Sequence, residues 1–149
     1  MKNQVQLITY VDRLGLGGLR ELNALLQGPL KGLFGGVHLL PFFHPIDGAD
    51  AGFDPIDHLS VDARLGDWSD VQALTQTVEV MGDVIVNHMS SSSPQFLDYQ
   101  AKGADSDYAG LFLRMDTVFP QGAREADLLT IYRPRPGCRS RPTRWPATG

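Results

Sequence analysis

Apolar positions divide residues 1–88 into segments that alternate between strand and helix patterns. Residues 5–10 are a short apolar and β-branched run, which predicts a central strand near the N-terminus. Leucines then recur at helical spacing between two glycine-rich turns, so we expect about three turns of amphipathic helix facing a sheet. These leucines are Leu19, Leu22, Leu25 and Leu26. Residues 36–43 predict a second strand, which completes one βαβ unit.

The same alternation continues through residues 67–88. Asp67 is placed to cap a helix whose apolar face carries Val71, Leu74 and Val78. Residues 84–86 form an unbroken β-branched run, as expected of a third parallel strand covered on both faces. The order β, α, β, α, β fits either a doubly wound sheet or a (β/α)₈ barrel, and periodicity does not choose between them.

Beyond His88 the alternation stops. Residues 90–93 predict a loop that can cap a short helix, and Phe96, Tyr99 and Gln100 suggest that helix. Residues 123–132 predict one more helix, which the following prolines cannot continue. We therefore expect an irregular subdomain inserted after the third strand.

Composition is that of a folded globular protein. The 149 residues are 42% hydrophobic and 20% charged. The net charge of -4, without a basic cluster over the main body, argues against nucleic acid and favours a small polar or neutral ligand. No apolar run approaches the roughly 20 residues of a membrane span, and the N-terminus lacks signal-peptide order, so we expect no membrane and a cytoplasmic location. Cys138 is the only cysteine, which excludes an internal disulfide and a zinc cluster.

The loop at residues 41–58, PFFHPIDGADAGFDPIDH, is the main candidate for ligand chemistry, because it leaves the end of a buried strand. Calcium is one alternative, but the aspartates lack the alternate-residue spacing and closing glutamate of an EF-hand. A rigid acidic turn is another, and it suits Asp47 and Asp57. The third is a sugar site, in which Asp50 accepts hydroxyl hydrogen bonds and Phe53 covers an apolar sugar face. The turn and sugar interpretations both stay open.

Histidines occur at several places in these segments. Asn87 and His88 come at a strand end, where barrel enzymes place ligand-contacting residues. The alternative for His88 is that it satisfies a buried carbonyl, but its position favours a ligand role. We assign His38, inside the second strand, a structural role, and we expect His44 and His58 to be solvated loop residues.

Two further segments have features of anion sites. The GLGG segment at residues 15–18 lacks the GxGxxG order and a following Lys-Ser/Thr, which predicts a turn rather than a phosphate loop. Arg133 and Arg135 lie in a proline frame and can meet an anion bidentately, although basic loop residues are usually solvated.

Several segments, in their order and spacing, closely resemble the bacterial sucrose phosphorylases of glycoside hydrolase family 13, the α-amylase superfamily. They are VQLITYVDRLG, LKGLFGGVHLLPFFHPIDGADAGFDPIDH, VDARLGDW, DVIVNHMS, SPQF, YAGLF and IYRPRPG. The resemblance covers residues 1–137 and implies an α/β fold. Residues 1–88 would be the N-terminal part of a (β/α)₈ TIM barrel, with its first three strands, and residues 89–137 the start of an inserted B domain. The barrel would be incomplete.

The resemblance implies a retaining transfer of glucosyl from sucrose to inorganic phosphate, which gives α-glucose 1-phosphate and fructose without a cofactor. An aspartate nucleophile and a glutamate acid carry this chemistry in the family. By the same resemblance Asp50 and His88 would hold the glucosyl hydroxyls, and Phe53 would line the pocket. Tyr132 and Arg135 would lie on a loop near the fructose or phosphate site.

The resemblance also shows what is missing. Asn87 resembles part of a motif where amylases often bind calcium, but sucrose phosphorylases generally need no metal. The family's catalytic carboxylates lie on the fourth, fifth and seventh strands, and no GxRxD motif occurs here, so we assign no catalytic residue. We expect a truncated, inactive fragment. Because three of eight strands leave a sheet edge and apolar faces uncovered, we also expect poor solubility or a dynamic state.

Two other functions are compatible with these residues. One is a non-catalytic carbohydrate-binding module, and the other is another member of the superfamily acting on α-glucosides. The sequence does not indicate an oligomeric state.

Residues 138–149, CRSRPTRWPATG, are suddenly basic and outside the resemblance. We interpret them as an out-of-frame tail that follows a frameshift or a sequencing error. The alternative is a genuine basic tail, but its three arginines show no pattern of their own. Resequencing the DNA across the codons for residues 136–141 decides between the two, since a clean read of the present frame contradicts a frameshift.

Overall fold

The computed structural model describes residues 3–15, 17–45 and 52–131. The chain divides into two compact units, residues 1–109 and residues 110–149. Each unit is described by itself.

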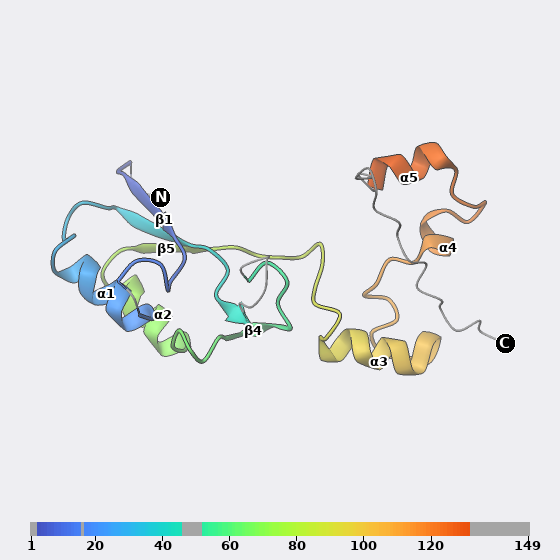
Figure 1. Ribbon diagram of the computed structural model, residues 1–149, viewed down its shortest axis with the longest axis horizontal. Coiled ribbons are helices and arrows are strands. Elements are labelled where there is room, and N and C mark those ends of the chain that lie inside the picture. Colours follow the sequence, from blue (N-terminus) through green and yellow to red (C-terminus); the bar gives the residue numbers. More distant parts are fainter. Residues whose placement is uncertain (1–2, 16, 46–51, 132–149) are drawn as a thin grey trace. The chain divides into compact units, whose positions relative to one another are not determined.

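A three-stranded parallel sheet lies at the centre of the first unit (Figure 1). Its strands are β1 (Gln6–Thr9), β2 (Gly36–Leu39) and β5 (Glu79–Gly82), in the order β1-β2-β5. The middle strand pairs with both neighbours, and every pairing is parallel. This arrangement confirms the expected α/β class with a parallel sheet.

Helices α1 (Leu19–Gln27) and α2 (Trp68–Thr75) lie on the same side of this sheet (Figure 1). Leu7, Val37 and Val80 stand in register across the three strands and pack toward the core between sheet and helices. The helices contribute the predicted apolar residues to that core, including the fully buried Leu22 and Leu74. The buried hydrophobic cluster consists of Val11, Leu19, Leu22, Leu26, Val37, Leu39, Phe42, Phe43, Leu65, Val71 and Leu74.

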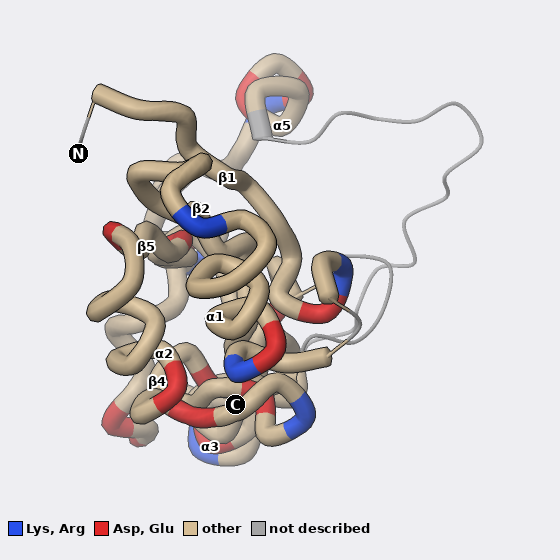
Figure 2. The backbone as a smooth tube through the Cα atoms, turned by 90° about the vertical axis from the view of Figure 1, so that its left-hand side faces the viewer, with Lys and Arg blue, Asp and Glu red and all other residues tan. Residues whose placement is uncertain are grey.

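Charged residues are largely absent from the strands that support this core. Strands β1 and β2 contain no Lys, Arg, Asp or Glu, and β5 contains only Glu79 (Figure 2). Most other charged positions among the described residues fall in the loops and helices, as expected where strand side chains are half-buried. No helix in the part of the chain that the structure describes is long and apolar enough to cross a membrane.

The predicted cap of the second helix is confirmed. The Asp67 carboxylate accepts hydrogen bonds from the backbone N–H groups of Ser69, at 2.7 Å, and Asp70, at 3.1 Å. Asp70 returns the interaction by accepting from Asp67 N at 3.1 Å. This reciprocal pair satisfies backbone donors that a helix start otherwise leaves unpaired.

The third strand differs from the prediction. The structure places β5 at Glu79–Gly82, whereas the side chains of Val84 and Val86 are 83% and 85% exposed and belong to no strand. Strand β2 ends at Leu39, which pairs with Gly82, so residues 84–86 have no neighbouring strand there. The prediction assumed a sheet covered on both faces. Residues 78–80 alternate apolar and polar instead, which is typical of a sheet covered on one face.

The second strand is also shorter than predicted. It ends at Leu39, and Phe43 begins a separate strand β3 (Phe43–His44), which pairs antiparallel with β4 (Asp57–Val61). Between them Pro41 has no backbone N–H to donate to a ladder. The chain therefore changes partner, from the parallel sheet to a two-stranded hairpin.

Helical segments follow β5. Helix α3 (Pro94–Lys102) begins at Ser93, whose hydroxyl accepts from Phe96 N at 3.4 Å, so both the predicted cap and the predicted helix are confirmed. A short 3-10 helix (Gly103–Asp105) follows it. The second unit contains α4 (Met115–Val118) and α5 (Glu125–Ile131), the latter within the predicted helix.

Candidate functional site

The β3–β4 hairpin positions residues 52–56, where the described part of the 41–58 loop resumes. Ile56 N donates to His44 O at 2.9 Å, and Ser90 N donates to Pro55 O at 3.0 Å. Pro55 is buried, and Gly52 has a φ of 90°, a backbone conformation that glycine adopts without strain. Residues 52–56 are thus held between the hairpin and the segment that leaves β5.

Two of the predicted site residues meet in this place. The His88 ring nitrogen Nε2 donates a hydrogen bond to the backbone carbonyl of Phe53. A carbonyl oxygen only accepts, so Nε2 carries the proton, and in a neutral ring Nδ1 has its lone pair available. An imidazole held in this way can accept a hydrogen bond from a ligand hydroxyl. The His88 side chain is exposed, and Phe53 is 36% exposed.

This contact bears on the alternative role of His88. The imidazole does satisfy a carbonyl, as that alternative requires, yet the histidine lies at an exposed position and is held by the backbone of an aromatic residue. The two roles are therefore compatible, and ligand binding by Phe53 and His88 stays a prediction. The other predicted site residues, Asp50, Tyr132 and Arg135, lie outside the described residues.

Asp57 is the first residue of β4, but its carboxylate makes the local backbone contact that the turn interpretation predicted. Its carboxylate accepts from the Ser60 hydroxyl and from Leu59 N, the latter at 2.8 Å. These hydrogen bonds, the Ser60 one first, hold the pKa of Asp57 below its ordinary value, because they stabilise the charged form. Asp57 is therefore occupied by its own backbone turn. Asp47, the other residue assigned to a turn, lies outside the described residues.

The predictions for the remaining histidines are partly confirmed and partly wrong. His44 and His58 are strand residues of β3 and β4, not loop residues, because the loop folds into a hairpin. His44 is exposed as expected, but His58 is half-buried, and its ring lies 6.2 Å from that of Phe43. His38 has the expected structural role, since its Nε2 lies 3.2 Å from Asp83 Oδ1 and links β2 to the residue after β5.

No cluster of three or more His, Cys, Asp or Glu side chains suited to a metal ion occurs among the described residues. Asp57 is held by its turn, and Asp54 is exposed. Asp47 and Asp50 lie outside the described part.

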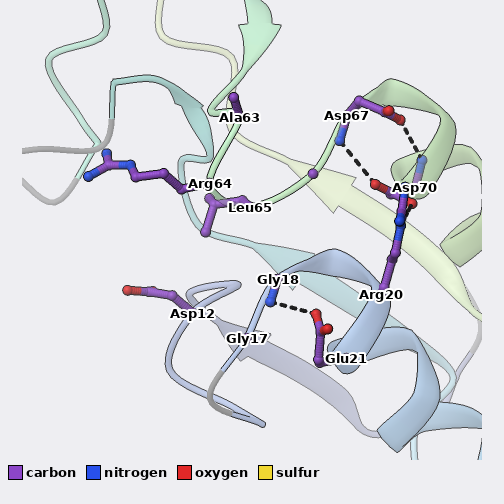
Figure 3. Close-up of a pocket in the computed structure, with 11 residues that line it drawn as sticks. Asp12, Gly17, Gly18, Arg20, Glu21, Ala63, Arg64, Leu65, Asp67 and Asp70 are labelled. Carbon is purple, nitrogen blue, oxygen red and sulfur yellow. Dashed lines mark hydrogen bonds and ion pairs between the residues drawn. The ribbon is translucent and has the colours of Figure 1, made fainter.

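A separate hollow of about 780 Å³ lies at the start of α1 (Figure 3). It includes none of the predicted site residues. Its lining comes from the α1 start, the loop at residues 63–67 and the first turn of α2, and consists of Asp12, Gly17, Gly18, Arg20, Glu21, Ala63, Arg64, Leu65, Gly66, Asp67 and Asp70.

Charged groups in this hollow pair with one another. Arg20 Nε donates to the buried Asp70 carboxylate at 2.7 Å, across 50 sequence positions, and Asp70 also accepts from Asp67 N (Figure 3). Glu21 accepts from Gly18 N at 2.8 Å, which lowers the pKa of Glu21. Four carboxylates face two guanidiniums among the lining residues, which disfavours an anionic ligand. The predicted turn, rather than a phosphate loop, fits this chemistry.

The hollow instead joins α1 to the loop before α2. Leu19 N donates to Leu65 O at 2.7 Å, and a Cβ at Gly18 would lie 2.3 Å from that carbonyl oxygen. Only glycine therefore permits this approach of the two backbones. No sequence pattern pointed to this junction, because its partners are about 50 positions apart, as Arg20 and Asp70 are.

Comparison with known proteins gives relatives for almost the whole chain. The chain is 66% identical over 139 residues to a sucrose phosphorylase of Agrobacterium vitis, covering 93% of this chain and 28% of the relative. It is 59% identical over 137 residues to a sucrose phosphorylase of Bifidobacterium adolescentis, covering 92% of this chain and 27% of that protein. No protein-family model matches the chain.

A solved structure agrees with these relatives. The crystal structure of sucrose 6F-phosphate phosphorylase from Thermoanaerobacter thermosaccharolyticum matches with a TM-score of 0.71 and 40% identity, covering 78% of this chain and 23% of that one. The chain thus spans between a fifth and a third of the length of the proteins it matches. Over that span, the expected resemblance to the sucrose phosphorylases of glycoside hydrolase family 13 is confirmed.

Proposed function

We propose that this chain is the N-terminal, glucosyl-recognising part of a sucrose phosphorylase and that it does not catalyse the transfer alone. The observation that carries the proposal is the 66% identity over 139 residues to a protein with that activity in its name. The full reaction would transfer the glucosyl group of sucrose to inorganic phosphate with retention, in the cytoplasm. Residues 1–88 would belong to the barrel and residues 89–137 to the inserted B domain.

The contact between Phe53 and His88 supports a role in holding the sugar. Sugars present hydroxyl groups beside apolar C–H faces, so an aromatic residue whose backbone carbonyl fixes an imidazole offers a partner of each kind. With Nε2 committed to the Phe53 carbonyl, Nδ1 of His88 is the atom that would accept a glucosyl hydroxyl. Asp50 would add a carboxylate acceptor. Tyr132 and Arg135 would contact the fructose or phosphate side.

The step that breaks the glycosidic bond needs groups that we do not assign to this chain. A retaining transfer requires a carboxylate nucleophile and a carboxylic acid about 5–5.5 Å apart. The family's carboxylates come from later strands by resemblance. The described carboxylates near Phe53 are committed elsewhere or exposed, Asp57 to its turn and Asp54 to solvent. Binding without bond cleavage is therefore the proposed role.

The first test mixes the purified chain with sucrose and phosphate and measures glucose 1-phosphate. No product above the protein-free control is expected, and measurable turnover by the chain would contradict the proposal. Whether residues 138–149 follow a frameshift is tested separately, by resequencing the DNA across the codons for residues 136–141.

A second test examines the proposed sugar-binding residues in a chimeric enzyme. Residues 1–137 are joined to the remainder of the Agrobacterium vitis relative, and the chimera is assayed with sucrose and phosphate. In it, Phe53→Leu keeps the backbone carbonyl that His88 needs but removes the aromatic face. We expect KM for sucrose to rise about two- to tenfold, since aromatic contacts contribute about 0.5–1.5 kcal/mol. His44→Ala, which changes an exposed side chain of β3, is the matched control and should leave KM unaltered.

A non-catalytic carbohydrate-binding module is the competing function. It requires that the isolated chain bind glucose or sucrose saturably and that Asp50→Ala weaken the binding. Titration calorimetry measures both. Saturable binding together with an inactive, well-folded chimera would favour the module over the proposed function.

A further inference from the structure

The segment that leaves β5 holds the loop at residues 52–56 at two points. The His88 ring donates to the carbonyl of Phe53, and Ser90 N donates to the carbonyl of Pro55 at 3.0 Å. The two donors and the two acceptors are each two positions apart, so the second hydrogen bond fixes the register in which His88 meets Phe53. Pro55 has no N–H, which leaves its carbonyl as the only backbone group of that residue that can pair.

Ser90 is fixed by a turn as well as by Pro55. Its carbonyl accepts from Ser93 N at 3.0 Å, and its hydroxyl oxygen accepts from Ser92 N at 3.2 Å. Ser90 is 8% exposed, and Ser93 has no exposed surface. Ser93 also caps α3 through its hydroxyl, so the turn at residues 90–93 is anchored at both ends.

The consecutive serines at residues 90–93 therefore have two different environments. Ser90 and Ser93 are buried, whereas Ser91 and Ser92 are exposed. Burying a hydroxyl group costs free energy unless the group is hydrogen-bonded, so a plain connection between β5 and α3 would not favour serine at the buried positions. The Ser93 hydroxyl serves the helix cap, and the Ser90 hydroxyl serves the turn that presents Ser90 N to Pro55.

The His88 side chain, by contrast, is exposed and is not fixed by burial. An exposed side chain keeps its rotamer freedom unless a bond restrains it. The hydrogen bond from Ser90 N to Pro55 O joins the two backbone segments without involving the ring. It therefore lowers the entropy that the His88 ring must lose to reach the Phe53 carbonyl.

We propose that Ser90 is a positioning residue for the pair of Phe53 and His88. Its N–H group and the turn that its hydroxyl closes hold His88 where Nε2 donates to the Phe53 carbonyl and Nδ1 is left for a ligand hydroxyl. The inference rests on the proposed function, because the ligand is the glucosyl group proposed there. Ser90 acts through His88 and does not itself contact the sugar.

The experiment uses the isotopically labelled full chain and follows the His88 ring nitrogens by NMR, with signals identified by their absence from His88→Gln. At a pH where the ring is neutral, we expect the proton on Nε2 alone in the unmodified chain. Ser90→Pro removes the N–H that Pro55 accepts, so the Nδ1–H form should appear as the ring is released. Ser90→Ala removes only the hydroxyl, and a smaller change in the same direction is expected. Ser90→Thr keeps both groups and should behave like the unmodified chain.

The neighbouring serine supplies a matched control. Ser91→Ala makes the same side-chain change at an exposed position and should leave the His88 ring unaltered. Hydrogen exchange at the β2 amides of each variant separates release of His88 from loss of the fold, and Ser90→Ala with Ser90→Thr decides the outcome if Ser90→Pro unfolds the chain. The proposal is overturned by an unmodified chain that already shows both ring forms, or by equal ring signals in Ser90→Ala and Ser91→Ala.

Glucose added to the same samples separates this inference from the proposed function. We expect glucose to shift the His88 ring signals, with an affinity about two- to tenfold lower in Ser90→Pro, as for the loss of one hydrogen bond. Ring signals that respond to the Ser90 substitutions but not to glucose uphold the positioning role and contradict the proposed function. Ring signals that respond to glucose but not to those substitutions give the reverse result.

Discussion

The two units of the molecule differ in how far their apolar side chains are withdrawn from water. In the first unit, leucines of α1 and β2 such as Leu22 and Leu39 have no exposed surface. In the second, none of residues 110–130 is buried, and Leu113 and Leu129 are 88% and 56% exposed. The first unit has a sheet on which helices pack, whereas α4 and α5 are short helices that are marginal without such packing.

Both units contain local ion pairs, such as Arg64 with Asp62 in the first, but among the described residues only the first unit also has ion pairs between distant segments. Arg114 pairs with Asp116 and Arg124 with Asp127, within three positions along the chain. Arg20 and Asp70 of the first unit lie 50 positions apart, and the Asp70 side chain is only 9% exposed. Local exposed pairs contribute little, because water screens them. Long-range contacts are therefore what distinguishes the ordered core, and the following substitutions test this difference.

Truncating a core leucine should have the largest effect. Leu22→Ala leaves a cavity between α1 and the sheet, and we expect the free energy of opening at β2 amides to fall by about 2–5 kcal/mol. Hydrogen exchange followed by mass spectrometry measures this protection. Leu129→Ala in α5 is the matched control, with an expected change below about 0.5 kcal/mol. Similar losses in the free energy of opening from the two substitutions would show that the two units do not differ in how much their leucines contribute to stability.

A glycine substitution should have the next largest effect. Gly18→Ala places a Cβ 2.3 Å from Leu65 O, and the hydrogen bond from Leu19 N to that oxygen prevents easy relief. We expect a loss of about 1–3 kcal/mol, by the same exchange measurement at α1 and α2. Gly110→Ala meets no atom within 4 Å and should be nearly neutral. A stable Gly18→Ala variant would show that the junction of α1 and the loop at residues 63–67 adapts.

The smallest expected effect is a loss of stability at the start of α2 when the pH is lowered. Hydrogen bonds from the Ser69 hydroxyl and the Asp70 and Ser69 amides lower the pKa of Asp67, so its charged form stabilises the native state. This stability is present above the ordinary aspartate pKa of 3.8 and is lost as the pH falls below that value through the lowered pKa. Exchange at the start of α2 should therefore speed up in that range.

Asp67→Asn removes the titrating group but keeps an acceptor for the cap. The variant should lack the acid-dependent step at α2. Asp127→Asn, in the second unit, removes a carboxylate that Arg124 holds at a lowered pKa, and it should leave α2 unaffected. Loss of the α2 step in both variants would contradict a local cap effect.

Much of the first unit follows from patterns within short segments. The spacing of Leu19, Leu22 and Leu26 predicted α1, and Asp67 and Ser93 predicted two helix starts, because apolar periodicity and caps are local properties. The prediction was wrong where the outcome depended on a distant partner. Residues 84–86 have strand composition but no strand beside them, since β2 ends at Leu39.

The same distinction between local patterns and distant partners applies to the candidate site. The sequence alone determined which residue types are available, an aromatic ring at Phe53 and an imidazole at His88, and it determined the resemblance that suggests a glucosyl ligand. Only the tertiary structure decided that His88 donates to the Phe53 carbonyl across 35 positions. It also decided that Asp57 serves its own turn and that the row of Ile8, His38 and Met81 faces away from the helices. Backbone pairing between distant segments sets these relations, and no local pattern specifies such pairing.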